Sequence, residues 1–171
     1  MNHDRYDDAW IAGLLRDVKR VAVIGASANT IRPSYFVTKY LIAKGYEVFP
    51  INPGRAGGEI LGRPTYASLA DVPQPIDIVD VFRRAEALPG IVQEIMALET
   101  LPKVVWLQLG IRDDAIAAVL EMAGIAVVQD RCPKIEYARL SGEIGWTGFN
   151  RRTVSSRKPK LSKGFQHFGL G

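Results

Sequence analysis

The sequence has little cysteine and histidine and no long uninterrupted apolar run. Its single cysteine, Cys132, cannot form a disulfide within the chain. Glu121 and Gly124 interrupt the best candidate for a membrane span, which needs roughly 18 apolar residues. The N-terminal MNHDRYDDAW is acidic, where a secretory signal would be basic and then apolar. We therefore expect a soluble, cytoplasmic protein without membrane contact.

The excess of basic residues is confined to the C-terminal end of the chain. Among 171 residues, 22 Lys and Arg outnumber 18 Asp and Glu, which gives a net charge of +4. From Ser141 onward there are six basic residues and one acid, whereas residues 1–140 have 16 basic and 17 acidic residues. We therefore divide the chain into a domain at residues 1–146 and a basic tail at residues 147–171.

The basic tail allows three interpretations. Phe165 and Phe168 alternate with its basic residues, a pattern that suits single-stranded nucleic acid. The tail could also contact an anionic cofactor, or it could be a solvated extension. Because the rest of the chain is slightly acidic, nucleic acid is the least favoured partner, and the solvated extension is the preferred interpretation.

Short apolar runs alternate with segments of helical period, and this alternation predicts an α/β fold. The expected strands are residues 21–25, 46–51, 77–81, 104–107 and 125–128. The expected helices are residues 7–17, 34–44, 89–99, 113–123 and 133–140. Together they predict a Rossmann-like, doubly wound, mostly parallel sheet of five or six strands in a three-layer domain, with the strand order 3-2-1-4-5.

The first expected strand ends in a glycine turn, VAVIGAS, that leads into a helix. Gly25 permits a close approach of the backbone to a ligand, while free N–H groups and the helix dipole favour an anion. The turn therefore predicts a phosphate site, with a tight turn that binds nothing as the alternative. Residues 52–66 form a long Gly-rich connection that we interpret as a binding loop.

Two nucleotide-binding fingerprints are incomplete or absent. In G-x-G-x-x-G, Ser27 and Thr30 replace the second and third glycines, and the second strand lacks the terminal acid that binds ribose hydroxyls. The sequence also lacks G-x-x-x-x-G-K-[ST]. Classical NAD binding and P-loop ATP hydrolysis are therefore disfavoured.

Five segments, taken in order, resemble the small CoA-binding proteins. They are VAVIGAS, FPINPGRAGGEILGRPTYASLADVP, IDIVDVFR, VVWLQLGI and VVQDRCPKIEYARL. The Rossmann-like domain of that family is similar to the CoA-binding half of the succinyl-CoA synthetase α subunit. The resemblance spans about residues 10–155 and implies coenzyme A or an acyl-CoA as the ligand.

The resemblance, together with the expectation that ligands of a doubly wound sheet lie at the carboxyl ends of its strands, predicts a set of cofactor-binding residues. They are Gly25, Ala26, Ser27, Arg32, Asn52, Pro53, Arg55, Val81, Phe82, Arg83, Gln108 and Gly110. The glycine turn would hold the pyrophosphate, and Arg55 and Arg83 would each hold a phosphate. Phe82 could contact adenine or pack in the core, and Arg55 could simply be solvated. Gln108 and Gly110 would pass the pantetheine arm.

No catalytic apparatus is predicted. The synthetases use a phosphorylated histidine in a second domain, for which this chain has no room, and no nucleophile with its base can be assembled at the expected cleft. We expect a CoA-binding protein without its own catalysis, and a homodimer is compatible with the sequence. The alternatives are an NAD(P)-binding oxidoreductase-like domain and an accessory subunit of a ligase.

Cys132 and Trp106 also lie near the expected cleft. Arg131 and Lys134 could lower the pKa of the Cys132 thiol enough for a mixed disulfide with CoA, although a buried structural cysteine is the favoured interpretation. Trp106 lies within VVWL and is expected in the core.

Overall fold

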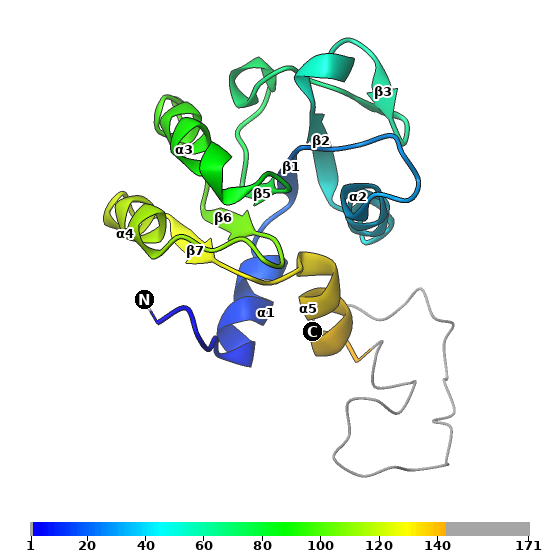
Figure 1. Cartoon of the computed structure of the whole chain (residues 1–171). Helices are drawn as coiled ribbons and strands as arrows, with labels where there is room; N and C mark the ends of the chain where they lie inside the picture. Colours follow the sequence, from blue (N-terminus) through cyan, green and yellow to red (C-terminus); the bar gives the residue numbers. More distant parts are fainter. Residues whose placement is uncertain (1, 143–171) are drawn as a thin grey trace, which may run out of the picture.

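A parallel sheet with helices on both faces forms the framework of residues 2–142, the part of the chain that the computed structural model describes (Figure 1). The strands of this sheet are β1 (Arg20–Ile24), β2 (Glu47–Ile51), β5 (Ile78–Val81), β6 (Val104–Leu107) and β7 (Ala126–Val128). The helices are α1 (Asp8–Arg16), α2 (Pro33–Ala43), α3 (Leu88–Met96), α4 (Asp114–Met122) and α5 (Pro133–Leu140). The predicted fold class, a Rossmann-like α/β domain with a doubly wound parallel sheet, is confirmed.

The predicted strand order is wrong. The order is β2-β1-β5-β6-β7, or 2-1-3-4-5 when these strands are numbered along the chain, instead of 3-2-1-4-5. The third strand pairs with β1, Val21 opposite Ile78, on the side away from β2. The connection from β2 to β5 runs back past β1, the reverse of the direction from β1 to β2. A right-handed connection in that direction must lie on the face of the sheet opposite to α2. The connection lies on that face, because its Leu69 is buried in the same core as Val79 and Ile91, on the side of α3.

The two faces of the sheet bury two separate apolar cores. One core lies beneath α1, α2 and α5 and includes Val21, Val23 and Trp106, the last fully buried as expected. The other lies beneath α3 and α4 and includes Ala22 and Ile24. Successive strand residues point to opposite faces, so a strand covered on both sides must be apolar throughout. This requirement explains the continuous runs VAVI and VVWL.

The connection between β2 and β5 contains short elements that the sequence pattern did not predict. They are η1 (Pro53–Arg55), β3 (Glu59–Ile60), β4 (Arg63–Pro64) and η2 (Leu69–Asp71), and the two strands form an antiparallel pair. Tyr66 fastens this segment to β2, since its N–H donates to Pro50 at 2.9 Å and its carbonyl accepts from Asn52 at 2.8 Å. Strands of two residues are too short to show an alternating pattern.

The predicted helix ends agree with the structure at several positions. Asp113 caps α4 by accepting from the N–H groups of Ala115 and Ile116, and Gly45 and Gly124 follow α2 and α4 with positive φ. Between residues 2 and 142, no helix is long and apolar enough to cross a membrane. The predicted tail and its boundary at residue 147 lie outside the described residues.

Candidate functional site

A cavity of about 850 Å³ opens at the carboxyl ends of the central strands. Residues after β5 and β6 form its floor, and the first turns of α2 and α5 form its walls. The chain leaves β1 toward β2 and leaves β5 toward β6, so the strand order reverses between β1 and β5. Ligands of open α/β sheets bind at such a reversal.

Gly25 brings the end of β1 against the end of β5. Its φ is +82°, and a Cβ at this position would lie 2.9 Å from the Phe82 carbonyl oxygen and 3.4 Å from Nε of Arg83. The Phe82 N–H also donates to the Ile24 carbonyl at 2.9 Å. Only a residue without a side chain fits at this position, beside the two residues that border the cavity.

Side-chain turns shape the loop from Gly25 to α2. Ser27 Oγ accepts from the Asn29 N–H at 3.1 Å, and Asn29 Oδ1 accepts from the Ile31 N–H at 3.1 Å. Such turns orient successive backbone groups without a helix or strand. Arg32, the N-cap residue of α2, is exposed and makes no side-chain capping bond.

Asn52 joins the loop after β2 to the glycine turn. Its Nδ2 donates to the Ala26 carbonyl at 2.8 Å, and its Oδ1 accepts from the Gly54 N–H at 3.0 Å. The predicted neighbours Pro53 and Arg55 lie in η1 and are exposed. Neither residue lines the cavity.

The predicted site residues thus fall into three groups. Phe82, Arg83, Gln108 and Gly110 line the cavity. The glycine-turn residues, Gly25, Ala26 and Ser27, lie at the end of β1, with Asn52 attached to them. The side chains of Arg32, Pro53, Arg55 and Val81 do not line the cavity, and Val81 is fully buried in β5.

The sequence analysis missed a buried carboxyl group beneath the cavity. Asp80 of β5 is 0% exposed, and its Oδ1 accepts from Nε2 of Gln108 at 2.8 Å. Burial raises the pKa of Asp80 to about 7, and the hydrogen bond from Gln108 opposes the shift. Within residues 2–142, its Oδ2 has no hydrogen-bond partner. An acid inside the apolar run IDIVDV was the available signal.

Cys132 lines the cavity at the start of α5 and is buried. Burial raises the pKa of its thiol, and nearby Asp80 raises it further, against the backbone N–H groups of Ile135 and Lys134. The less favoured alternative, a lowered pKa, is therefore wrong, because loss of hydration outweighs the basic neighbours. The favoured interpretation, a buried cysteine, is confirmed.

Apolar side chains surround the mouth of the cavity. Ile31 and Phe36 on the α2 side, Leu109 after β6 and Ile135 of α5 all line it and are exposed. Ile31 is 79% exposed and Leu109 57%. Ligand cavities are commonly apolar with a few polar groups. These four residues come from two loops and two helices in separate parts of the chain, so no local pattern in the sequence groups them.

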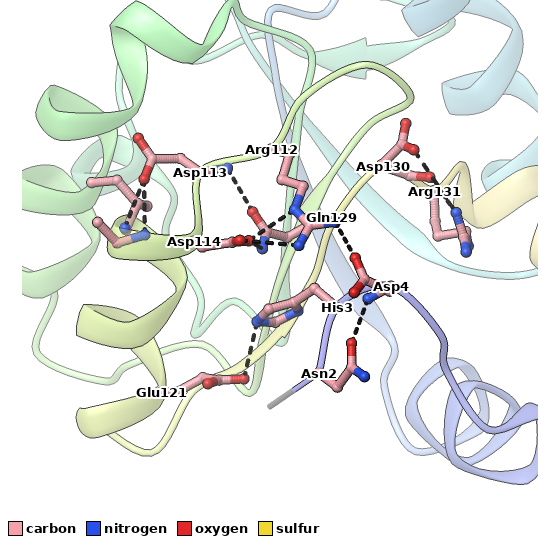
Figure 2. Close-up of polar contacts among 12 residues, drawn as sticks. Asn2, His3, Asp4, Arg112, Asp113, Asp114, Glu121, Gln129, Asp130 and Arg131 are labelled. Atoms are coloured by element: carbon pink, nitrogen blue, oxygen red, sulfur yellow. Dashed lines mark hydrogen bonds and ion pairs between the residues drawn. The ribbon is translucent and has the colours of Figure 1, made fainter.

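A polar network holds the loop that carries Gly110 and Ile111 (Figure 2). Arg112 binds both carboxylate oxygens of Asp114, at 2.9 and 3.0 Å, and also binds Asp4 at 2.6 Å. Gln129 accepts from the Asp113 N–H at 2.7 Å and donates to Asp114 at 3.0 Å. Through Asp4 the N-terminal segment is thus bonded to the loop after β6, part of which lines the cavity.

The strand order defines a doubly wound α/β domain with a cavity at the strand ends, where the order reverses. Residues 19–138 match the family model for the CoA binding domain, and the chain belongs to this family.

Three relatives illustrate the extent of the similarity. The uncharacterized protein YneT of Bacillus subtilis is 40% identical over 130 residues, which cover 76% of this chain and 93% of YneT. The structure of cell-free ID.343 from Thermus thermophilus is 42% identical with a TM-score of 0.72, covering 77% of this chain and 96% of that one. Subunit alpha of the ADP-forming acetate–CoA ligase I of Pyrococcus furiosus is 36% identical over 80 residues, 44% of this chain but 17% of that subunit.

Proposed function

We propose that this protein binds coenzyme A or an acyl-CoA at the cavity and has no catalytic apparatus of its own. The observation that carries the proposal is the cavity at the strand-order reversal, bordered by Phe82 and Arg83 beside the Gly25 turn. Membership of the CoA binding domain family selects CoA among the phosphorylated ligands that such a turn could hold.

The pyrophosphate would bind at the glycine turn. Backbone N–H groups between Gly25 and α2, together with the positive end of the helix dipole, favour an anion there. Arg83 is exposed, and its Nε lies near Gly25, so its guanidinium can bind a phosphate oxygen. Arg55 is proposed as a phosphate ligand through the family resemblance, and Arg32 from its place at the start of α2. Both are exposed, and neither is among the residues that line the cavity.

The adenine and the pantetheine arm would occupy the cavity itself. Phe82 is half-buried and offers a ring to adenine, while the strand end at Gln108 and Gly110 offers polar groups to the amides of pantetheine. This division places the anionic part of CoA at the loop and the uncharged arm against the apolar walls.

Calorimetric titration of one preparation with CoA, dephospho-CoA, acetyl-CoA and NAD tests the proposal. We expect the CoA species to bind more tightly than NAD. Failure of all three CoA species to bind would overturn the proposal. Tighter binding of NAD than of CoA would instead favour the oxidoreductase-like alternative, even though the G-x-G-x-x-G fingerprint is incomplete.

The similarity to an acetate–CoA ligase subunit favours one alternative, an accessory role in a ligase. Because this chain matches 17% of that subunit, the ligase activity would require further domains from a partner chain. Affinity purification should then recover an ATP-grasp partner, and the pair should form an acyl-CoA from acid, ATP and CoA. Recovery of the chain alone, with no ligase activity, contradicts this alternative.

A further inference from the structure

The side chain of Gln108 connects the cavity to the carboxyl group buried inside the sheet. Gln108 is 6% exposed and lines the cavity, and its Nε2 donates to Oδ1 of Asp80 at 2.8 Å. Across the sheet, Asp80 pairs with Val23 of β1 and Trp106 of β6. Trp106 uses its Nε1 for the Arg131 carbonyl, at 2.9 Å. Gln108 is therefore the side chain that donates to Oδ1 of Asp80, while Oδ2 has no partner within residues 2–142.

The chemistry of Asp80 fixes which end of the Gln108 carboxamide faces it. An ionised carboxylate accepts hydrogen bonds and donates none, so the carboxamide must present its NH₂ group. The reverse orientation would place two acceptor oxygens against each other in a buried site, which is costly. Within residues 2–142, no donor is bonded to Oε1 of Gln108, so this carbonyl remains available to a ligand in the cavity.

We propose that the Gln108 side-chain carbonyl accepts an amide N–H of the pantetheine arm, and that Asp80 is the positioning residue that holds the carboxamide in this orientation. The proposal rests on CoA binding at this cavity. Pantetheine contains two amides, so it brings N–H donors into a cavity whose walls are largely apolar. A buried acceptor in the cavity favours a ligand that brings an N–H donor over a ligand without one.

Protonation of Asp80 would remove the requirement for this orientation and allow the reverse one. A protonated carboxyl gains an O–H donor, which can face Oε1 of Gln108 once the carboxamide has turned over. The NH₂ group would then face the cavity and could not accept from the ligand. Because burial raises the pKa of Asp80 to about 7, this exchange falls within an accessible pH range.

Few other groups near Asp80 titrate in that range. The thiol of Cys132, the N-cap residue of α5, is a titratable neighbour, and burial raises its pKa, so it stays protonated. On the α2 side, Pro33, Phe36 and Val37 line the cavity and carry no charge. The charged residues that line the same cavity are Arg83, Arg84, Glu86 and Lys134.

Titration calorimetry with dephospho-CoA between pH 5.5 and 8.5 tests the proposal, because this probe lacks the 3′-phosphate that titrates in the same range. We expect the wild-type affinity to be about tenfold lower at pH 5.5 than at pH 8.5, the effect of one hydrogen bond. Asp80→Asn should keep the high-pH affinity and lose the pH dependence, since its amide oxygen can still accept from Gln108. Gln108→Met should bind about tenfold more weakly at pH 8.5 and show a flat profile.

The control variant is Gln93→Met on the exposed face of α3, which should retain the wild-type profile. A flat wild-type profile, or a wild-type slope that persists in Asp80→Asn or Gln108→Met, overturns the proposal. These results differ from failure of the proposed function, in which neither CoA nor dephospho-CoA binds the wild-type protein at any pH.

Discussion

Asn52 donates a hydrogen bond of 2.8 Å from Nδ2 to the carbonyl of Ala26, and this bond ties the loop after β2 to the glycine turn after β1. Ala26 is 1% exposed, so its carbonyl has little access to water if the bond is removed. The relationship joins two segments that the sequence resemblance assigns to the same ligand. Through the Asn52 side chain, the geometry of the glycine turn therefore depends on the loop after β2.

Asn52→Ala should lower the free energy of unfolding by about 1–3 kcal/mol, the cost of a buried carbonyl that loses its partner. It should also weaken CoA binding, because the glycine turn loses its support. Urea unfolding and calorimetry measure the two effects. The control is Gln74→Ala, which removes an exposed side-chain bond of 3.2 Å to Glu47 and should change neither quantity. Equal behaviour of the two variants would contradict this account.

Gly25→Ala should destabilise the protein more than Gly124→Ala. Both glycines have a φ of +82°, so both substitutions incur left-handed strain of about 1–2 kcal/mol. A Cβ at Gly25 would also lie 2.9 Å from the Phe82 carbonyl oxygen, whereas nothing lies within 4 Å at Gly124. The difference between the two unfolding free energies therefore measures the close approach of β1 to β5. A difference of zero would mean that this contact relaxes without cost.

The sequence was sufficient to predict the elements of the sheet but not their order. Apolar runs such as VAVI and VVWL show that a strand is buried on both faces, and so predict its type and place in the chain. The order depends on which face the connection from Ile51 to Ile78 crosses. That choice is reflected in the burial of Leu69 in the same core as Val79 and Ile91, which no local pattern encodes.

The residues of the candidate site likewise include some that the sequence predicted and some that it did not. Gly25 was predictable because a left-handed turn after a strand leaves a local signal, and its neighbours followed from the family resemblance. Asp80 was missed because its role depends on burial and on Gln108, which is 28 residues away in the chain. The alternative of a lowered pKa for Cys132 failed for a related reason, since the sequence shows charged neighbours but not the loss of water around a thiol.

Ser27→Asp should weaken CoA binding by about 2 kcal/mol or more, since it places a negative charge where the pyrophosphate is proposed to bind. Calorimetric titration with CoA measures the change. Ala70→Asp is the matched control, because it adds the same charge at an exposed position in η2 on the far face of the sheet. If Ser27→Asp and Ala70→Asp bind CoA equally well, the glycine turn does not belong to the site.

Asp77 should stabilise the protein against acid. It is buried, which disfavours its charged form, but Arg20 and the backbone N–H groups of Arg20 and Lys19 bind its carboxylate and lower its pKa to about 2. Its contribution is present above pH 4 and is lost as the pH falls from about 4 to 2. Asp77→Asn should therefore cost about 2 kcal/mol at pH 7 and progressively less below pH 4.

Urea unfolding of wild type and Asp77→Asn at pH 7, 4 and 2.5 measures how the difference between their free energies of unfolding decreases as the pH falls. Asp17→Asn serves as the control, because the Asp17 side chain is 72% exposed beside Arg16. A stability difference for Asp77→Asn that stays constant across the three pH values would exclude ionisation as the cause.

Asp80 should have the opposite effect on stability, although it lies three residues further along the same segment. Its folded pKa, about 7, is above its ordinary value of 3.8, so the folded state holds a proton that the unfolded state releases between these values. The free energy of unfolding should therefore fall as the pH rises from about 4 to 7, by up to about 4 kcal/mol. Asp80→Asn removes this group and should flatten that part of the profile. Urea unfolding from pH 4 to 8 measures the slope, and an unchanged slope in Asp80→Asn would assign the pH dependence to another group.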